Sequence, residues 1–425
     1  MKTPIINEAL LCPSRRVFLA GAGTFVAWAA MPRFAFAGVT RDPRLVVVIL
    51  RGAMDGLAVV PPIGDPDYPG LRGDMAIGTA GYEATLPLND FFGLNQAMPG
   101  LHGMYAANEA AIVHAVASAY RDRSHFDGQD VLESGMTTPH ASDTGWLNRV
   151  AAALPAGDKV RPANGLAASP TVPLILRGAA PILTWTPPGF RPADSDTIAR
   201  LTDLYAESDP ELARVFAAGY DVDKLAAATP GMNGKPASTM MNGGQTKPAN
   251  AGGLAASFTA LAAGAGRLLA DPEGPRLAAI SYDGWDTHAS EGAADGRLAD
   301  LLAAFDAALV GLKDAMAPVW GDTAVIVMTE FGRTARINGT EGTDHGTATA
   351  AFLMGGAIKG GRIIADWPGL KETQLYQQRD LAPTTDLRAV IKGVLRDHLG
   401  LSERVMTDAI FPGSATVKPM DGLIA

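Results

Sequence analysis

The sequence has almost no cysteine. Its 425 residues include one, Cys12, close to the N-terminus. Disulfides and thiolate metal sites are therefore excluded from the rest of the chain, where a metal site must use histidine, carboxylate or hydroxyl ligands. The sequence also has no haem-attachment, flavin or iron–sulfur motif, which argues against a redox enzyme.

Basic residues are in the minority. The chain has 35 Lys and Arg against 44 Asp and Glu, and without residues 1–37 the balance is 31 to 43, a formal charge of −12. Proteins that bind nucleic acids need a basic face. We therefore expect no nucleic-acid partner.

The apolar run near the N-terminus, residues 18–30, is too short to span a membrane comfortably. Arg15-Arg16 precedes it and Ala35-Phe36-Ala37 follows it, which is the pattern of a twin-arginine secretory signal cleaved before Gly38. The sequence thus predicts that residues 1–37 direct export by the twin-arginine translocase. The product is a periplasmic or secreted protein with no stable membrane span, and an uncleaved membrane anchor is the alternative.

Five apolar runs, several rich in β-branched residues, alternate with stretches of helical periodicity. Such an alternation predicts an α/β domain with a doubly wound, mostly parallel central sheet and helices on both faces. We expect a single domain over residues 38–425, interrupted by a long exposed loop near 230–253 that is rich in Gly, Pro, Asn and Ser. The expected strands are 45–50, 110–117, 277–282, 323–328 and 349–354, and the clearest helices are 255–269 and 296–315.

Polar side chains follow four of these strands and precede the fifth. In open α/β sheets ligands bind beyond the carboxyl ends of the strands, so these side chains should meet at one edge. Carboxylates and imidazoles in such a place suit a divalent ion, Zn, Mn, Ca or Mg. The candidate metal ligands are Asp55, Asp283, Asp286, His288, Glu330, Asp344 and His345.

The run after the second strand adds candidate catalytic groups. Ser124 stands near a predicted helix N-terminus, where a nucleophilic hydroxyl or a bound anion is favoured. Arg121 and Arg123 could hold the anion in bidentate fashion. The alternatives are that Ser124 only caps the helix and that the arginines pair with Asp122 and Asp127.

Several of these segments together resemble a known family. RLVVVILRGAMDGL, RSHFDGQDVLESG, YDGWDTH, VMTEFGRT and TDHG are similar to segments of a family of twin-arginine-exported bacterial proteins of unknown function, placed within the alkaline phosphatase and sulfatase superfamily. The likeness covers about residues 45–401. It implies a sulfatase-like fold with a metal-binding Asp at Asp55, an Asp–His pair formed by Asp283 or Asp286 with His288, and a final metal-binding His at His345.

One position departs from the superfamily pattern. Glu330-Phe331 stands where an Asp-His or Asp-Asn pair is expected, so one nitrogen or amide ligand is missing. Arg333 could be an ion-pair partner of Glu330. Our first hypothesis is a metal-dependent hydrolase or transferase for a phosphate or sulfate ester, with Ser124 as nucleophile. The alternative is a non-catalytic exported binding or assembly protein that keeps the fold.

Overall fold

The described part of the chain begins just after the predicted export signal. The structure is a computed structural model that describes residues 41–78, 85–154, 163–187 and 251–425. The signal at 1–37 and residues 230–250 of the predicted loop lie outside these ranges. The elements described below all belong to one unit, Asp42–Ala425.

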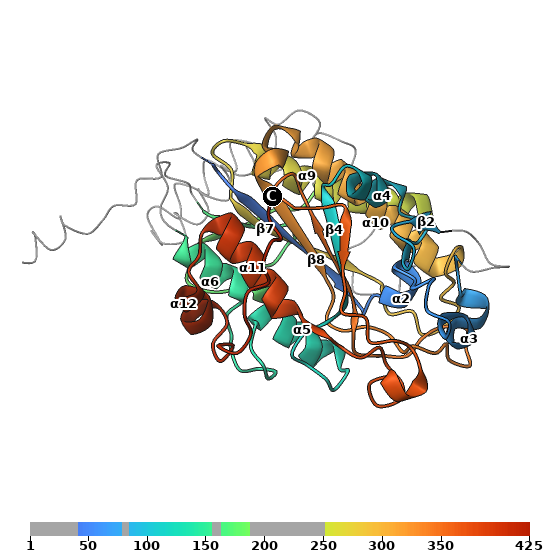
Figure 1. Cartoon of the computed structure of the whole chain (residues 1–425). Helices are drawn as coiled ribbons and strands as arrows, with labels where there is room; N and C mark the ends of the chain where they lie inside the picture. Colours follow the sequence, from blue (N-terminus) through green and yellow to red (C-terminus); the bar gives the residue numbers. More distant parts are fainter. Residues whose placement is uncertain (1–40, 79–84, 155–162, 188–250) are drawn as a thin grey trace, which may run out of the picture. The chain divides into compact units, whose positions relative to one another are not determined.

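The five predicted strands are confirmed and form the middle of one sheet (Figure 1). The sheet has nine strands in the described ranges, in the order β10-β4-β9-β8-β1-β7-β5-β6, with β11 also paired to β4. β9 runs antiparallel to β8 and β4, whereas the other pairings are parallel, so the prediction of a mostly parallel sheet is confirmed. The strands are β1 (Arg44–Arg51), β4 (Ala110–Ala117), β5 (Gly165–Ala167), β6 (Ile182–Thr184), β7 (Leu277–Asp283), β8 (Thr323–Met328), β9 (Thr349–Met354), β10 (Arg362–Ile364) and β11 (Thr385–Asp386).

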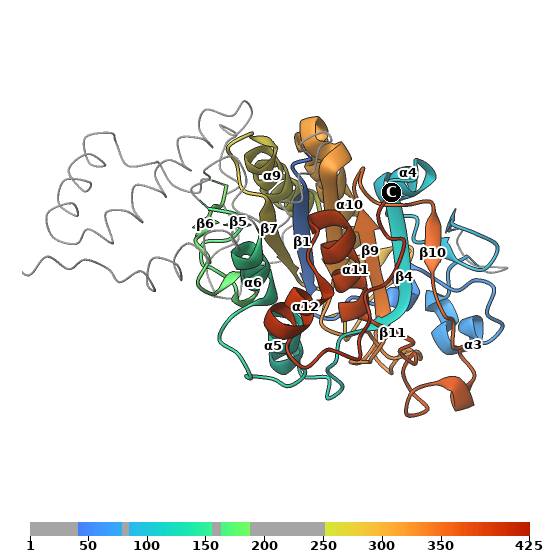
Figure 2. The same cartoon turned by 60° about the vertical axis from the view of Figure 1, so that its left-hand side comes forward.

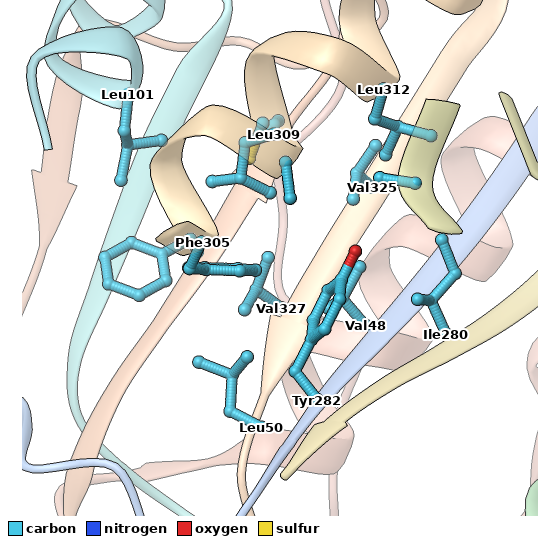
Figure 3. Packing of buried hydrophobic residues seen from close by; sticks show 14 of the residues in the cluster. Val48, Leu50, Leu101, Ile280, Tyr282, Phe305, Leu309, Leu312, Val325 and Val327 are labelled. Atoms are coloured by element: carbon cyan, nitrogen blue, oxygen red, sulfur yellow. The ribbon is translucent and has the colours of Figure 1, made fainter. Parts of the chain in front are cut away.

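Alternate residues of each central strand enter two separate cores, as the period of two along a strand requires. Val46, Val48 and Leu50 belong to the core that contains residues of α4 (Pro99–Ala106), α9 (Ala251–Ala270) and α10 (Gly296–Ala315). Figure 3 shows Val48 and Leu50 in this core with Leu101 of α4 and Phe305 and Leu309 of α10. Leu45, Val47 and Ile49 face the other core, which contains residues of α5 (His125–Ser134), α6 (Trp146–Ala153) and α11 (Leu387–Leu399). Helices therefore cover both faces, as predicted.

The remaining elements are short. They lie mainly in the connections between strands and helices. They are α2 (Gly56–Val59), α3 (Tyr68–Arg72), α12 (Glu403–Val405), the hairpin β2 (Leu86–Pro87) and β3 (Gly93–Leu94), and the single turns η1 (Gly73–Met75), η2 (Leu174–Leu176), η3 (Ala317–Asp322), η4 (Glu372–Gln374) and η5 (Met406–Ile410).

Helix α9 is longer than predicted. It begins at Ala251, so residues 251–253 of the predicted loop are helical. By length and composition, Gly253–Ala270 is also the one helix in the described ranges that could cross a membrane. Phe258, Leu268 and Leu269 on this helix are buried against the sheet. Core helices of water-soluble proteins have the same apolar composition, so this is weak evidence for a membrane span.

The carboxyl ends of β1, β4, β7 and β8 meet at one edge of the sheet, where β9 begins. Figures 1 and 2 both show α2, α3 and α5 at this end. The turn after β1 is tight: Gly52 has φ +117°, and a Cβ there would lie 2.5 Å from the backbone N of Asp286. Glycine is required at this position because the loops after β1 and β7 touch through their backbones.

Candidate metal centre

Three imidazoles and one carboxylate converge at this edge of the sheet. Nε2 of His288 lies 2.9 Å from Nε2 of His345 and 3.1 Å from Oδ1 of Asp286. Nε2 of His125 and Nε2 of His345 each lie 3.5 Å from the same carboxylate oxygen. We call these four residues the histidine cluster. They come from the start of α5, the loop after β7 and the loop before β9.

Each imidazole of the histidine cluster is oriented by an oxygen on its far side. Nδ1 of His125 lies 2.8 Å from Oε1 of Glu330, and Nδ1 of His345 lies 2.9 Å from the carbonyl oxygen of Arg123. Nδ1 of His288 lies 3.4 Å from Oδ1 of Asp344. Each of these oxygens can accept a hydrogen bond from an Nδ1–H, and in a neutral ring bound in this way the lone pair is on Nε2. The three Nε2 lone pairs therefore point into the cluster, as in metal sites whose histidines are held by outer oxygen acceptors. The hydrogen bond with Glu330 raises the pKa of His125.

The spacing of the donor atoms fits a single ion. Ligands at about 2.0–2.1 Å from a tetrahedral ion lie about 3.3 Å from one another. Four of the donor–donor distances in the histidine cluster are 2.9–3.5 Å and bracket that value. The donor atoms of His125, Asp286 and His345 all lie within 4.8 Å of one another. Nε2 of His125 is moreover buried without a hydrogen-bond partner among the described residues. A buried polar atom without a partner is costly unless another group binds it.

The cluster is open to solvent on one side. The side chains of Asp286 and His288 are 42% and 44% exposed, whereas those of His125 and His345 are about one quarter exposed. Burial lowers the pKa of His345, and the neighbouring His125 acts in the same direction. A neutral His345 is the form that can offer its lone pair to a metal.

Arg333 anchors the carboxylate of the histidine cluster. Its guanidinium is buried and donates to the carbonyl oxygens of Gly52, Ala53, Trp285 and Thr343 as well as to Oδ1 of Asp286. Partial burial opposes ionisation of Asp286, but the hydrogen bond and charge of Arg333 lower its pKa below the ordinary value. The expectation that Arg333 pairs with Glu330 is wrong, since Arg333 ties the loops after β1 and β7 to Asp286.

Glu330 and Phe331 both contact the imidazole of His125. Glu330 is fully buried, and its carboxylate accepts from Gly52 N, Thr329 Oγ1, Gln129 Nε2 and His125 Nδ1. Burial opposes ionisation of Glu330, yet these hydrogen bonds, that of His125 foremost, lower its pKa. Phe331 stacks on the His125 ring at 5.0 Å between centroids. Glu330 therefore supports the His125 imidazole from behind, and Phe331 packs against the same ring.

Asp55 lies at the same edge but outside the histidine cluster. It is buried, both carboxylate oxygens are paired with the guanidinium of Arg72, and Oδ1 also accepts from the backbone N–H of Leu57 and Ala58 at the start of α2. A carboxylate already held by a cation and two amides has little capacity left for a metal. The structure thus gives the predicted ligand Asp55 a structural partner instead.

The predicted catalytic groups after β4 are placed differently from the expectation. Ser124 is the N-cap residue of α5, but its hydroxyl makes no capping hydrogen bond. Arg121 donates to the carbonyl oxygens of Ser118 and Tyr120, and Arg123 donates to Asp380 and Gln377. Both guanidinium groups therefore bind protein oxygens away from the histidine cluster. Arg123 also does not pair with Asp122 or Asp127, the other role considered for it.

A scan against protein-family models matches residues 42–410 to a single family, described as a protein of unknown function (DUF1501). The chain belongs to the DUF1501 family. No curated protein matches the chain in sequence.

Solved structures similar to this DUF1501 chain are distant. Ps i-CgsB in complex with k-i-k-neocarrahexaose has 11% identity and a TM-score of 0.37, covering 76% of this chain and 68% of that one. The lipoteichoic acid synthase LtaP from Listeria monocytogenes has 10% identity and a TM-score of 0.37, covering 90% and 77%. The phosphonate monoester hydrolase of Agrobacterium radiobacter has 10% identity and a TM-score of 0.33, covering 85% of this chain and 74% of that one. At TM-scores this low the likenesses carry no argument about this chain.

Of the ligands predicted for this DUF1501 chain, the structure brings together Asp286, His288 and His345. Asp344 and Glu330 orient two of the imidazoles, and Asp283 ends β7 with an exposed side chain that has no described contact with the cluster. His125 was missed, although it belongs to the same RSHFDG run as Ser124. The signal was present, because a histidine at the start of a helix that follows a central strand lies at the ligand-binding edge.

Proposed function

We propose that this protein is a metal-dependent hydrolase that acts on a phosphate or sulfate ester. The observation that carries the proposal is the convergence of three Nε2 lone pairs on the carboxylate of Asp286, at the solvent-exposed carboxyl edge of a mostly parallel sheet. His125, Asp286 and His345 each offer an atom within 4.8 Å of the others. His288 lies outside this set of three and is proposed as a fourth donor, because its Nε2 lies 2.9 Å from Nε2 of His345 and 3.1 Å from Oδ1 of Asp286.

The donor set favours a transition metal. Three imidazole nitrogens and one carboxylate oxygen suit Zn²⁺ better than Mn²⁺, which prefers oxygen ligands. Ca²⁺ and Mg²⁺ prefer sites made almost wholly of oxygen. The broader prediction of Zn, Mn, Ca or Mg is narrowed accordingly, with Zn²⁺ the first ion to test.

The residues around the cluster have separable roles in such a reaction. A divalent ion bound here would supply Lewis acidity and charge neutralisation for an anionic ester. Glu330 and Asp344 hold two of the imidazoles in the required tautomer, and Arg333 fixes Asp286. Hydrolysis breaks the bond between the ester oxygen and phosphorus or sulfur, adds a water-derived oxygen to that atom and leaves a proton on the released alcohol.

Ser124 is the candidate for a covalent nucleophile. Its hydroxyl is not used as a helix cap, and it stands one residue before His125 at the N-terminus of α5, where an anion is favoured. In that route Oγ bonds to phosphorus or sulfur as the ester bond breaks, and the Oγ proton ends on the released alcohol. Water then hydrolyses the enzyme ester and returns a proton to Oγ.

The test combines metal content with turnover. The protein, purified without chelators, should contain near-stoichiometric metal by mass spectrometry and should hydrolyse members of a panel of phosphate and sulfate monoesters. Ser124→Ala should abolish turnover and leave the metal content unchanged, whereas retained turnover would remove Ser124 as nucleophile. Failure to bind Zn²⁺, Mn²⁺, Ca²⁺ or Mg²⁺ after incubation with each would overturn the proposal.

A non-catalytic binding or assembly protein is the second candidate. It is favoured by the engagement of Asp55 with Arg72 and of Arg121 and Arg123 with other protein groups, which takes three predicted participants away from the site. The two functions differ in turnover. A protein that retains stoichiometric metal and hydrolyses no ester in the panel would fit this second function.

We further propose that the protein works outside the cytoplasm after export by the twin-arginine translocase. The proposal is supported by Arg15-Arg16 and by the small residues at positions 35 and 37. Replacing both arginines by lysine should leave the uncleaved precursor inside the cell. The N-terminus of the exported protein, read by mass spectrometry, should be Gly38. Export of the double-lysine variant would contradict the proposal.

A further inference from the structure

A groove of about 610 Å³ adjoins the histidine cluster. Its walls come from the start of α3, the loop at 334–344 and the loop at 370–379. Asp344 belongs to both places, because it lines the groove and its Oδ1 lies 3.4 Å from Nδ1 of His288. The groove therefore begins at Asp344, whose carboxylate lies beside Nδ1 of the His288 imidazole. Its volume is within the range of sites that hold small molecules, about 300–1,000 Å³.

The walls of this groove are held to the rest of the site by backbone contacts. Thr334 exchanges hydrogen bonds with Asp344, since its N–H donates to the Asp344 carbonyl oxygen at 2.9 Å and its hydroxyl accepts from the Asp344 N–H at 3.1 Å. The Ile337 N–H donates to the Leu71 carbonyl oxygen at 3.3 Å, which joins the loop to α3. The groove is thus a formed part of the fold.

The lining combines an apolar surface with two arginines. Leu71, Leu370, Leu375 and Ile337 supply the apolar part. Arg336 is exposed, and in the ranges that the structure describes it has no ion pair.

The second arginine, Arg379, is 40% exposed and lies 3.3 Å from a carboxylate oxygen of Asp380, which Arg123 also binds. The Arg379 guanidinium is therefore only partly engaged by Asp380 and can also contact a ligand. Guanidinium groups in such a place bind carboxylate, phosphate or sulfate groups in bidentate fashion.

Acidic residues in the lining limit how much negative charge the ligand can carry. Asp344 is engaged by His288 and by Asn338 Nδ2 at 3.1 Å, but Asp67 and Glu372 also face the groove. Two arginines against Asp67, Asp344 and Glu372 give the lining a formal charge of −1. A polyanion would be repelled, whereas a ligand with one acidic group could lie against the arginines.

We infer that this groove binds the organic part of the substrate, and that this part has an apolar body and one additional acidic group. The inference rests on the proposed function, because it places the ester group at the histidine cluster and the remainder of the same molecule in the groove. Arg336 and Arg379 select the additional acidic group, and the leucines and Ile337 contact the apolar body.

The experiment compares matched ligands on the metal-loaded protein by titration calorimetry. The ligands are phenyl phosphate and 4-carboxyphenyl phosphate, with the corresponding sulfate pair. We expect the carboxylated member to bind about 10-fold more tightly, the equivalent of about 1.4 kcal/mol. Arg336→Gln and Arg379→Gln should reduce that preference and leave the metal content and the affinity for the member without the carboxylate unchanged. Arg404→Gln, on an exposed arginine outside the groove, is the matched control.

The outcomes separate the inference from the proposed function. Equal affinity for the two members of a pair, or a preference that survives both arginine variants, would overturn the inference while the hydrolase proposal stands. A protein that binds no metal would fail the proposed function and, with it, the assignment of the groove. A carboxylate preference lost in both groove variants and kept in Arg404→Gln supports the inference.

Discussion

Two aspartates at the same edge of the sheet have opposite surroundings. Asp55 follows β1 and Asp286 follows β7, two strands that pair directly, and each contacts an arginine. Asp55 is 1% exposed, and its oxygens are occupied by Arg72 and by two amides of α2. Asp286 is 42% exposed and has three imidazole nitrogens within 3.5 Å of one oxygen.

The difference shows how burial and neighbours decide what a strand-end carboxylate does. A buried carboxylate needs a paired cation and hydrogen bonds, because an unpaired buried charge is strongly destabilising. Arg72 meets that need for Asp55, so the pair belongs to the stability of the fold. Asp286 remains accessible, and imidazole lone pairs surround it, so it can bind an ion. The two residues should therefore respond differently to the same substitution.

The largest expected effect is on stability. Asp55→Asn should lower the free energy of unfolding by about 3–5 kcal/mol, because it leaves the buried guanidinium of Arg72 without its anion. Asp286→Asn should cost about 1 kcal/mol, since this carboxylate is partly solvated and Arg333 keeps four carbonyl acceptors. Urea denaturation of the metal-free proteins measures both. Similar losses in the two variants would contradict the division of roles.

The second expected effect is on Zn²⁺ affinity, which should depend on Asp286 and not on Asp55. Binding of a structural Zn²⁺ is worth about 10–16 kcal/mol over four ligands, or about 2.5–4 kcal/mol for each. Asp286→Asn should therefore weaken Zn²⁺ affinity by about 100-fold or more, measured by competition with a chromophoric chelator. Asp55→Asn should bind Zn²⁺ as the unchanged protein does, at temperatures where it is folded. Loss of metal in Asp55→Asn alone would make Asp55 the ligand.

The central part of the fold could be predicted from the sequence, whereas its edges could not. Apolar runs such as 323–328 gave the strand bounds because a strand buried on both faces needs a continuous run of apolar residues. Three-residue strands such as β5 and β6 contain too few residues for a period to be visible. The antiparallel direction of β9 was also invisible, since direction depends on connections and not on local composition.

Only part of the candidate site could be predicted, because the sequence shows which residues follow a strand but not which distant side chains they contact. Strand-end position correctly grouped Asp286, His288 and His345, because the edge of a parallel sheet collects such residues. The role of Asp55 depends on Arg72, whose side chain reaches it from α3, and no local pattern announces that contact. The role of His125 depends on the buried Glu330, which lies in the loop after β8, 205 positions away. Long-range pairing of charges is the information that sequence motifs lack.

A third effect tests the support behind the imidazoles. Glu330→Gln removes the carboxylate that accepts from Nδ1 of His125, and loss of such an outer oxygen typically weakens metal affinity by about 10–100-fold. Asp344→Asn is the matched comparison and should have the smaller effect, because Asp344 is 53% exposed and lies 3.4 Å from His288. The same chelator competition measures both. Equal, negligible losses would show that neither carboxylate orients a ligand.

The smallest effect concerns Glu291, a third carboxyl group beside Asp55 and Arg72. Burial, and then the nearby charge of Asp55, raise the pKa of Glu291 from 4.5 to about 8. Between these two values the folded protein keeps a proton that the unfolded chain releases. The contribution of Glu291 to the free energy of unfolding should therefore be greatest below about pH 4.5 and should fall as the pH rises towards 8.

Replacing Glu291 should make the free energy of unfolding depend less on pH. Glu291→Gln keeps a group that can accept from Thr343 Oγ1 but cannot lose a proton. The decline in unfolding free energy between pH 5 and 8, measured by urea denaturation without metal, should be smaller than in the unchanged protein by at least about 1 kcal/mol. Glu341→Gln, at an exposed position in the adjacent loop, is the control and should leave the slope unchanged. An equal slope in Glu291→Gln would mean that Glu291 is ionised in the fold, and Arg72 would then serve two carboxylates.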